Sequence, residues 1–166
     1  MIGASHIAAG AAVGVALKEP WLAFPTAFAI HYLLDMIPHH EYLPPEELRD
    51  SSFKNDVQTL GKATIDAIVG FSAVAIITKF NLITLAAGFS GALPDILSGI
   101  GFTLTRGGTV KPHSLLGRIF AAQKRFHKFI HLWKRPHAAP LWRAIINQAL
   151  PMFILLWAAF RYFGAP

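Results

Sequence analysis

A ten-residue stretch at the end of an apolar run carries three histidines and one carboxylate. His31 and Asp35 are spaced i, i+4, so on a helix they share one face. Pro38 is expected to end that helix, which lets His39 or His40 fold back towards the same place. Imidazole nitrogens and carboxylate oxygens are ligands for Zn²⁺, Mn²⁺ or Fe²⁺. The stretch therefore predicts one half of a divalent-metal site.

Further ionisable residues stand in or beside other apolar segments of the chain. Such groups are costly in a membrane unless they neutralise one another or bind a cation. We expect them to meet near the cytoplasmic interface, with Asp35, Asp95 and His113 as the catalytic groups. The predicted metal ligands are His6, His31, Asp35, His39, Asp66, Asp95 and His113.

Each of these residues also has a structural interpretation. His6 could lie among lipid headgroups, and Asp66 could occupy a helix start, where the helix dipole favours a carboxylate. Asp35 and Asp95 could instead accept hydrogen bonds from backbone amides. His127 and His131 are again spaced i, i+4. They could join the metal site or lie at the membrane interface, and we favour the interface.

The composition indicates an integral membrane protein. Hydrophobic residues make up 54% of the 166 residues and charged residues only 14%, against roughly a quarter charged in soluble domains. The mean hydropathy is +0.45. The chain has no cysteine, which excludes disulfides and thiolate metal ligands.

The apolar segments predict an all-α, polytopic membrane domain. Lys18-Glu19-Pro20 and Asn81 mark the turns of two helical hairpins. Gly10 and Gly14 form a small-residue face suited to close helix packing. The predicted segments are a hairpin over 2–37, a polar loop over 38–60, a hairpin over 61–104, a basic amphipathic segment over 105–140 and a last transmembrane helix over 141–163.

The two hairpins resemble an internal repeat with an offset of 60 residues. At that offset Asp35 corresponds to Asp95 and His6 to Asp66. Ionisable residues are rare in membrane segments, so their coincidence favours a duplication. The additional histidines of the first copy predict an asymmetric site that leans towards the first hairpin.

The basic residues predict the orientation in the membrane. Eight of the fifteen Lys and Arg residues lie between Arg106 and Arg135, and the positive-inside rule places this segment and the N-terminus in the cytoplasm. Residues 111–135 interleave cations with apolar side chains, which favours anionic lipid headgroups over nucleic acid. Arg106 or Arg118 is expected to hold a substrate phosphate.

Three short motifs resemble those of a known family. They are Ser5-His6, Leu93-Pro94-Asp95, and Arg106-Gly107-Gly108 with His113-Ser114-Leu115-Leu116 further on. The chain is similar to small bacterial and archaeal inner-membrane proteins of the metal-dependent hydrolase type, which include a LexA-binding, membrane-associated member. It departs from that pattern at Ile96-Leu97-Ser98, where the family has further ligands, and it lacks the histidine before Arg106. His31, His39 or His40 could substitute for these losses.

The resemblance and the ionisable residues together predict a function. We expect metal-dependent hydrolysis of a phosphoester or similar bond in a lipid-like substrate, at the cytoplasmic face of a bacterial or archaeal inner membrane. The metal, Zn or Mn, would activate a water nucleophile. Two alternatives stand beside this hypothesis. One is a non-catalytic scaffold that binds a partner, and the other is a small metal or proton transporter.

Overall fold

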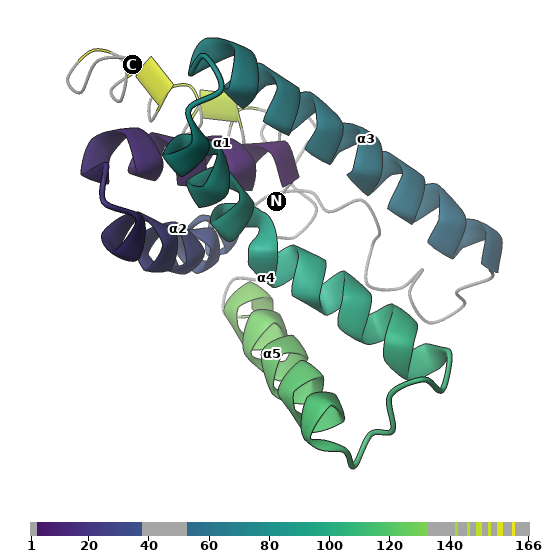
Figure 1. Cartoon of the computed structure of the whole chain (residues 1–166). Coiled ribbons are helices and arrows are strands. Elements are labelled where there is room, and N and C mark those ends of the chain that lie inside the picture. Colours follow the sequence, from purple (N-terminus) through teal and green to yellow (C-terminus); the bar gives the residue numbers. More distant parts are fainter. Residues whose placement is uncertain are drawn as a thin grey trace.

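The described part of the chain is entirely helical (Figure 1). The computed structural model describes residues 3–37 and 53–132 and scattered positions between 142 and 161. No strand occurs within these residues, which confirms the predicted all-α class. The predicted last transmembrane helix over 141–163 lies mostly outside them. The helices are α1 (Gly3–Leu17), α2 (Pro20–Asp35), α3 (Phe53–Ile77), α4 (Leu82–Arg106) and α5 (Leu115–Leu132).

Helices α1 and α2 form the predicted first hairpin. Lys18 takes a left-handed backbone conformation (φ 58°) at the turn. Pro20 then opens α2, where its fixed φ suits a first helical position. The helix ends at Asp35, with Met36 as its C-cap, close to the end that Pro38 predicts.

The second pair of helices departs from the predicted hairpin. Helix α3 begins at Phe53, within the stretch predicted as a polar loop over 38–60, because its polar first turns lack the apolar periodicity that marks a helix in a sequence. Asn81 lies at the predicted turn and its side chain accepts a hydrogen bond from the Thr84 N–H. Beyond the turn α3 and α4 diverge and contact each other little (Figure 1).

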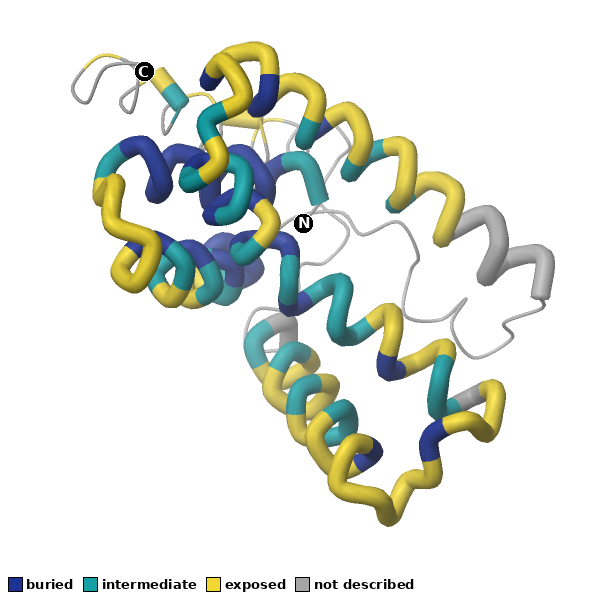
Figure 2. Tube along the Cα trace, viewed as in Figure 1, coloured by how far each residue is buried: buried dark blue, intermediate teal, exposed yellow. Residues whose placement is uncertain are grey.

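Helix α1 is the centre of the fold. Every residue from Ser5 to Val15 is buried, and α2, α3 and α4 all pack against this helix (Figure 2). A β-carbon at Gly10 would collide with the carbonyl oxygen of Ala87 in α4. At Gly14 a β-carbon would lie 2.9 Å from the β-carbon of the same Ala87. The predicted close packing is therefore confirmed, and α4 is the partner helix.

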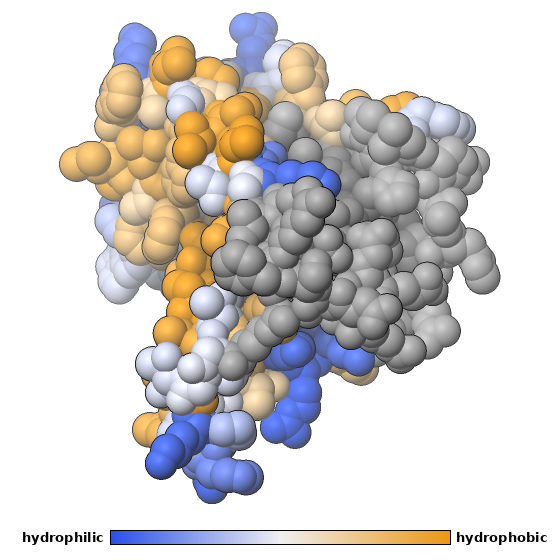
Figure 3. All heavy atoms as spheres, turned by 90° about the vertical axis from the view of Figure 1, so that its right-hand side faces the viewer, coloured by the Kyte–Doolittle hydropathy of each residue, from blue (hydrophilic) through white to orange (hydrophobic). Residues whose placement is uncertain are grey.

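Two helices are long and apolar enough to cross a membrane by length and composition. They cover Leu60–Ile77 of α3 and Leu82–Thr105 of α4. Large apolar side chains of α3 are exposed, among them Leu60, Ile68 and Ile76. Figure 3 shows hydrophobic residues over much of the coloured part of this face, with hydrophilic residues at its upper and lower ends and a smaller hydrophilic group between them.

Helix α4 changes direction along its length (Figure 1). Pro94 lies inside this helix, and its missing N–H leaves the Ser90 carbonyl without its intrahelical donor, which is a usual cause of a kink. The first half of α4 lies against α1 and α2, and α5 packs beside it further along the chain. Asp95 directly follows Pro94 and therefore lies near the middle of α4.

Candidate metal centre

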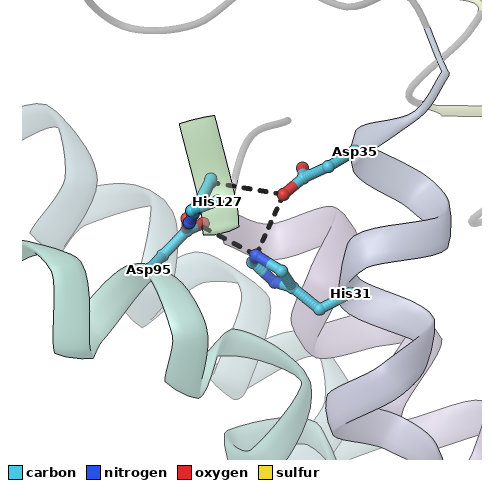
Figure 4. A group of neighbouring side chains, drawn as sticks. All are labelled: His31, Asp35, Asp95 and His127. Atoms are coloured by element: carbon cyan, nitrogen blue, oxygen red, sulfur yellow. Dashed lines mark ion pairs between the residues drawn. The ribbon is translucent and has the colours of Figure 1, made fainter. Parts of the chain in front are cut away.

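Three helices bring four ligand-type side chains together (Figure 4). His31 and Asp35 come from α2, one turn apart, as their spacing predicts. Asp95 comes from α4 and His127 from α5. One ligand atom from each residue lies within 4.8 Å of the other three. We call these four residues the metal group.

The distances within the metal group suit a small cation. From Oδ2 of Asp35, Nε2 of His31 lies at 3.0 Å and Nε2 of His127 at 3.3 Å. From Oδ1 of Asp95, each of the same two nitrogens lies at 3.6 Å. A tetrahedral ion with ligands at about 2.0–2.1 Å has ligand-to-ligand edges of about 3.3 Å. These four edges are therefore close to those of a tetrahedral site.

The orientation of the His31 ring turns Nε2 towards the carboxylates. Its Nδ1 lies 2.8 Å from the carbonyl oxygen of Gly91 in a buried hydrogen bond. A carbonyl only accepts, so Nδ1 is the donor, and in the metal-binding form of the ring Nε2 would carry the lone pair. Nε2 is buried and makes no hydrogen bond among the described residues. A cation between Nε2 and the carboxylate oxygens would satisfy both.

Gly91 permits this arrangement because it lacks a side chain. A β-carbon at Gly91 would lie 2.5 Å from the carbonyl oxygen of His6. The glycine therefore lets α4 approach α1 closely and places its own carbonyl beside His31. A hydrogen bond from the outer ring nitrogen to a backbone carbonyl is a common support for metal-binding histidines.

His6 adjoins the metal group from α1. Its ring stacks on that of His31 with centroids 3.9 Å apart. Its Nε2 lies 3.2 Å from Oδ1 of Asp35 and 3.9 Å from Oδ2 of Asp95. In each carboxylate, the oxygen nearest His6 is therefore not the one that faces His31 and His127.

Helix α5 is held at the centre by polar contacts around His127. The Nδ1 of His127 lies 3.4 Å from the Ser98 hydroxyl. The Tyr32 hydroxyl donates to Oε1 of Gln123, and Nε2 of Gln123 donates to the carbonyl of Pro94. Gln123 thus ties α5 to both α2 and α4, one turn before His127.

Accessibility differs across the cluster. The side chains of His6 and His31 are fully buried and that of Asp35 is 1% exposed, whereas that of Asp95 is 39% exposed. Beside Ser98 a groove of about 170 Å³ runs between α4 and α5. Phe102, Phe120 and Lys124 are among its lining residues. The cluster is therefore closed on the α1 side, and its most exposed member, Asp95, comes from α4.

Of the predicted ligands, the structure brings His6, His31, Asp35 and Asp95 together. Other predicted ligands lie elsewhere. Asp66 accepts a hydrogen bond from the Ala4 N–H at 2.9 Å, so it stabilises the start of α1, where the dipole favours a carboxylate. His113 is exposed in the turn before α5. His39 and His40 are outside the described residues.

His127 lies in the metal group, whereas the sequence favoured a position at the membrane interface. Its spacing from His131 was visible in the sequence, but the same helix presents several polar residues that could serve equally well. Which polar residue of α5 faces the metal group depends on how α5 packs along α4. Sequence periodicity does not give that arrangement. The side chain of His131 is outside the described residues.

The predicted phosphate-binding arginines are distant from the metal group along their helices. Arg118 precedes His127 by nine residues and Arg106 follows Asp95 by eleven, which corresponds to about 13 Å and 16 Å of helix. The side chain of Arg106 is outside the described residues. Lys124 is nearer, one turn before His127, and it lines the groove. Lys124 is therefore better placed than either arginine to hold a phosphate beside the metal group.

Comparison with known proteins finds no matching family model, no matching curated protein and no matching solved structure.

Proposed function

We propose that the protein is a membrane-associated, metal-dependent hydrolase that acts on a phosphoester or similar bond of a lipid-like substrate. The observation that carries the proposal is the metal group itself. Ligand atoms from three helices converge, and the hydrogen bond from His31 to Gly91 turns the other ring nitrogen, Nε2, towards Asp35. Such an arrangement is stabilised by a cation.

His31, Asp35, Asp95 and His127 would hold a divalent ion, with Zn and Mn as the candidates. Two carboxylates neutralise one divalent charge, which suits a cluster whose inner side chains are buried. Bound there, the ion would lower the pKa of a water to about 7 and polarise the scissile group. The partly exposed Asp95 marks the side from which water and substrate would approach.

The groove between α4 and α5 is the proposed substrate site. Ser98 connects it to the metal group through His127. Phe102 and Phe120 offer apolar contacts to a lipid chain, and Lys124 offers a cation to the phosphate. In the reaction the water oxygen bonds to phosphorus, the bond to the leaving oxygen breaks, and the leaving oxygen takes up the proton that the water releases.

The proposed setting is a bacterial or archaeal inner membrane, with the N-terminus and the basic segment at the cytoplasmic face. Apolar side chains of α5, among them Leu115, Ile119 and Phe129, are exposed beside the cations Arg118 and Lys128. A helix of this kind lies on a membrane surface and attracts anionic headgroups. It would place the groove at the lipid interface.

The test uses the full chain, purified in detergent and assayed with lipid phosphoesters and soluble phosphoesters. We expect release of product that needs added Zn²⁺ or Mn²⁺, stops with a chelator and is absent from Asp35→Asn. If the protein binds metal, yet its turnover equals that of Asp35→Asn on every substrate, the hydrolase proposal is wrong.

A second candidate, metal-ion transport, is favoured by the position of Asp95 near the middle of a helix that could cross a membrane. Ionisable residues at that depth are typical of ion pathways. Flux of Mn²⁺ into liposomes that contain the protein, lost in Asp95→Asn and not accompanied by turnover, would establish transport in place of hydrolysis.

A further inference from the structure

We propose that the cluster holds a second divalent ion, bound by His6 and by the outer oxygens of Asp35 and Asp95, so that both carboxylates bridge two metals. The inference rests on the metal group of the proposed function and extends it from one ion to two. The observation behind it is that the two oxygens of each carboxylate face different histidines.

Each carboxylate divides its oxygens between two sets of histidines. Oδ2 of Asp35 faces His31 and His127, whereas Oδ1 of the same residue faces His6. Asp95 repeats the division. Its Oδ1 faces His31 and His127, and its Oδ2 faces His6. One oxygen from each carboxylate is therefore directed to each of two positions.

The His6 side chain has the features of a ligand rather than of a packing residue. The residue is only 1% exposed, although imidazole is polar. Its Nε2 lies 3.2 Å from Oδ1 of Asp35 but forms no hydrogen bond among the described residues. An ion at this position would satisfy the His6 nitrogen.

Two bridging carboxylates are a suitable frame for paired metals. In two-metal hydrolytic sites the ions lie about 3.5–4 Å apart, and together they stabilise the attacking and the leaving oxygen. The His6 and His31 rings stack with centroids 3.9 Å apart, which is close to this separation. Stacked imidazoles can each direct a nitrogen to one of two neighbouring ions.

Charge predicts that the two positions differ in affinity. One divalent ion neutralises Asp35 and Asp95, because the histidine ligands are neutral when they bind metal. A second divalent ion leaves the cluster positive, so it should bind more weakly until an anion joins it. Phosphate supplies that anion, which also suits a phosphoester substrate.

The test counts the ions in full-length protein in detergent. Metal-free protein is titrated with Mn²⁺, and bound metal is measured by elemental analysis and by electron paramagnetic resonance. We expect two equivalents per chain and a spectrum of coupled ions. Inorganic phosphate should tighten the second equivalent by about tenfold or more, within the usual range of coupling between two ligands.

The matched variants are His6→Ala and His6→Gln, with His113→Ala as the control. Both His6 variants should keep one equivalent with the six-line spectrum of an isolated Mn²⁺, while His113→Ala keeps two. Circular dichroism checks that each variant retains its helices.

Several results would overturn the inference. One equivalent in the unaltered protein rules out the second ion but leaves the hydrolase proposal standing. Two equivalents that persist without His6 place the second ion elsewhere. An unaltered protein that binds no metal rejects both the inference and the metal group.

Discussion

The two sides of the cluster are built differently. On the closed side His6, His31 and Asp35 project from α1 and α2, and their side chains are at most 1% exposed. On the open side Asp95 and His127 come from α4 and α5, and their side chains are 39% and 14% exposed. The closed side is packed into the core of the fold, whereas the open side borders a groove.

The difference indicates that the two sides have different roles in binding the metal. Backbone contact across Gly91 and the buried hydrogen bond of His31 fix the closed side. The open side depends on the docking of α5, through polar contacts such as those of Gln123. Preorganised ligands supply affinity, and an exposed ligand leaves room for exchange with water or substrate. The variants below test this contrast, in order of decreasing effect.

Loss of the closed-side carboxylate should have the largest effect. Asp35→Asn removes the negative charge that faces His6, His31 and His127. We expect bound metal to fall to background in elemental analysis. Asp66→Asn is the control, because the amide oxygen can still accept from the Ala4 N–H. If both variants lose metal equally, the assignment of Asp35 as a ligand fails.

Loss of the open-side histidine should be severe but not complete. His127→Ala leaves the other three ligands of the metal group in place, so we expect affinity to fall by at least the roughly 100-fold that is the upper end for loss of an outer-shell partner. The measurement is a competition titration with a chromogenic chelator. An unchanged affinity would return His127 to the interfacial role that the sequence suggested.

Filling the contact between α1 and α4 should damage the closed side indirectly. Gly91→Ala places a methyl group 2.5 Å from the His6 carbonyl oxygen, and we expect a loss of about 1–3 kcal/mol in the free energy of unfolding. Gly99→Ala, in the same helix, meets nothing within 4 Å and should not destabilise. Thermal unfolding in detergent compares the two, and equal melting temperatures would contradict the proposed close packing.

Removal of the support for His127 should have the smallest effect. Ser98→Ala deletes the hydroxyl 3.4 Å from Nδ1 of His127, which should weaken metal affinity by about tenfold. Ser72→Ala, an exposed serine of α3, serves as the control. A loss as large as that of His127→Ala would show that the open side is as rigid as the closed side.

The sequence predicted the closed side better than the open side. His6, His31 and Asp35 stand out because ionisable residues are rare in apolar helices. His127 belongs to an amphipathic helix with many polar residues, and its selection depends on how α5 returns along α4. Gly10 and Gly14 predicted close packing, but their partner, α4, follows from the three-dimensional arrangement alone.

Asp66 shows the limit of the same reasoning. It is as rare in its helix as Asp35, yet its partner is the backbone N–H of Ala4. A carboxylate in an apolar segment predicts that some donor or cation faces it. For Asp66 the partner is a donor and not a cation, because the start of α1 lies against α3.

The most direct test of the metal group is X-ray absorption spectroscopy on zinc-loaded, full-length protein. We expect nitrogen and oxygen ligands at about 2.0–2.1 Å, with the outer scattering of more than one imidazole, and the loss of this signal in Asp35→Asn. Protein that retains no zinc after dialysis, or zinc with a shell of oxygen ligands and no imidazole, would contradict it.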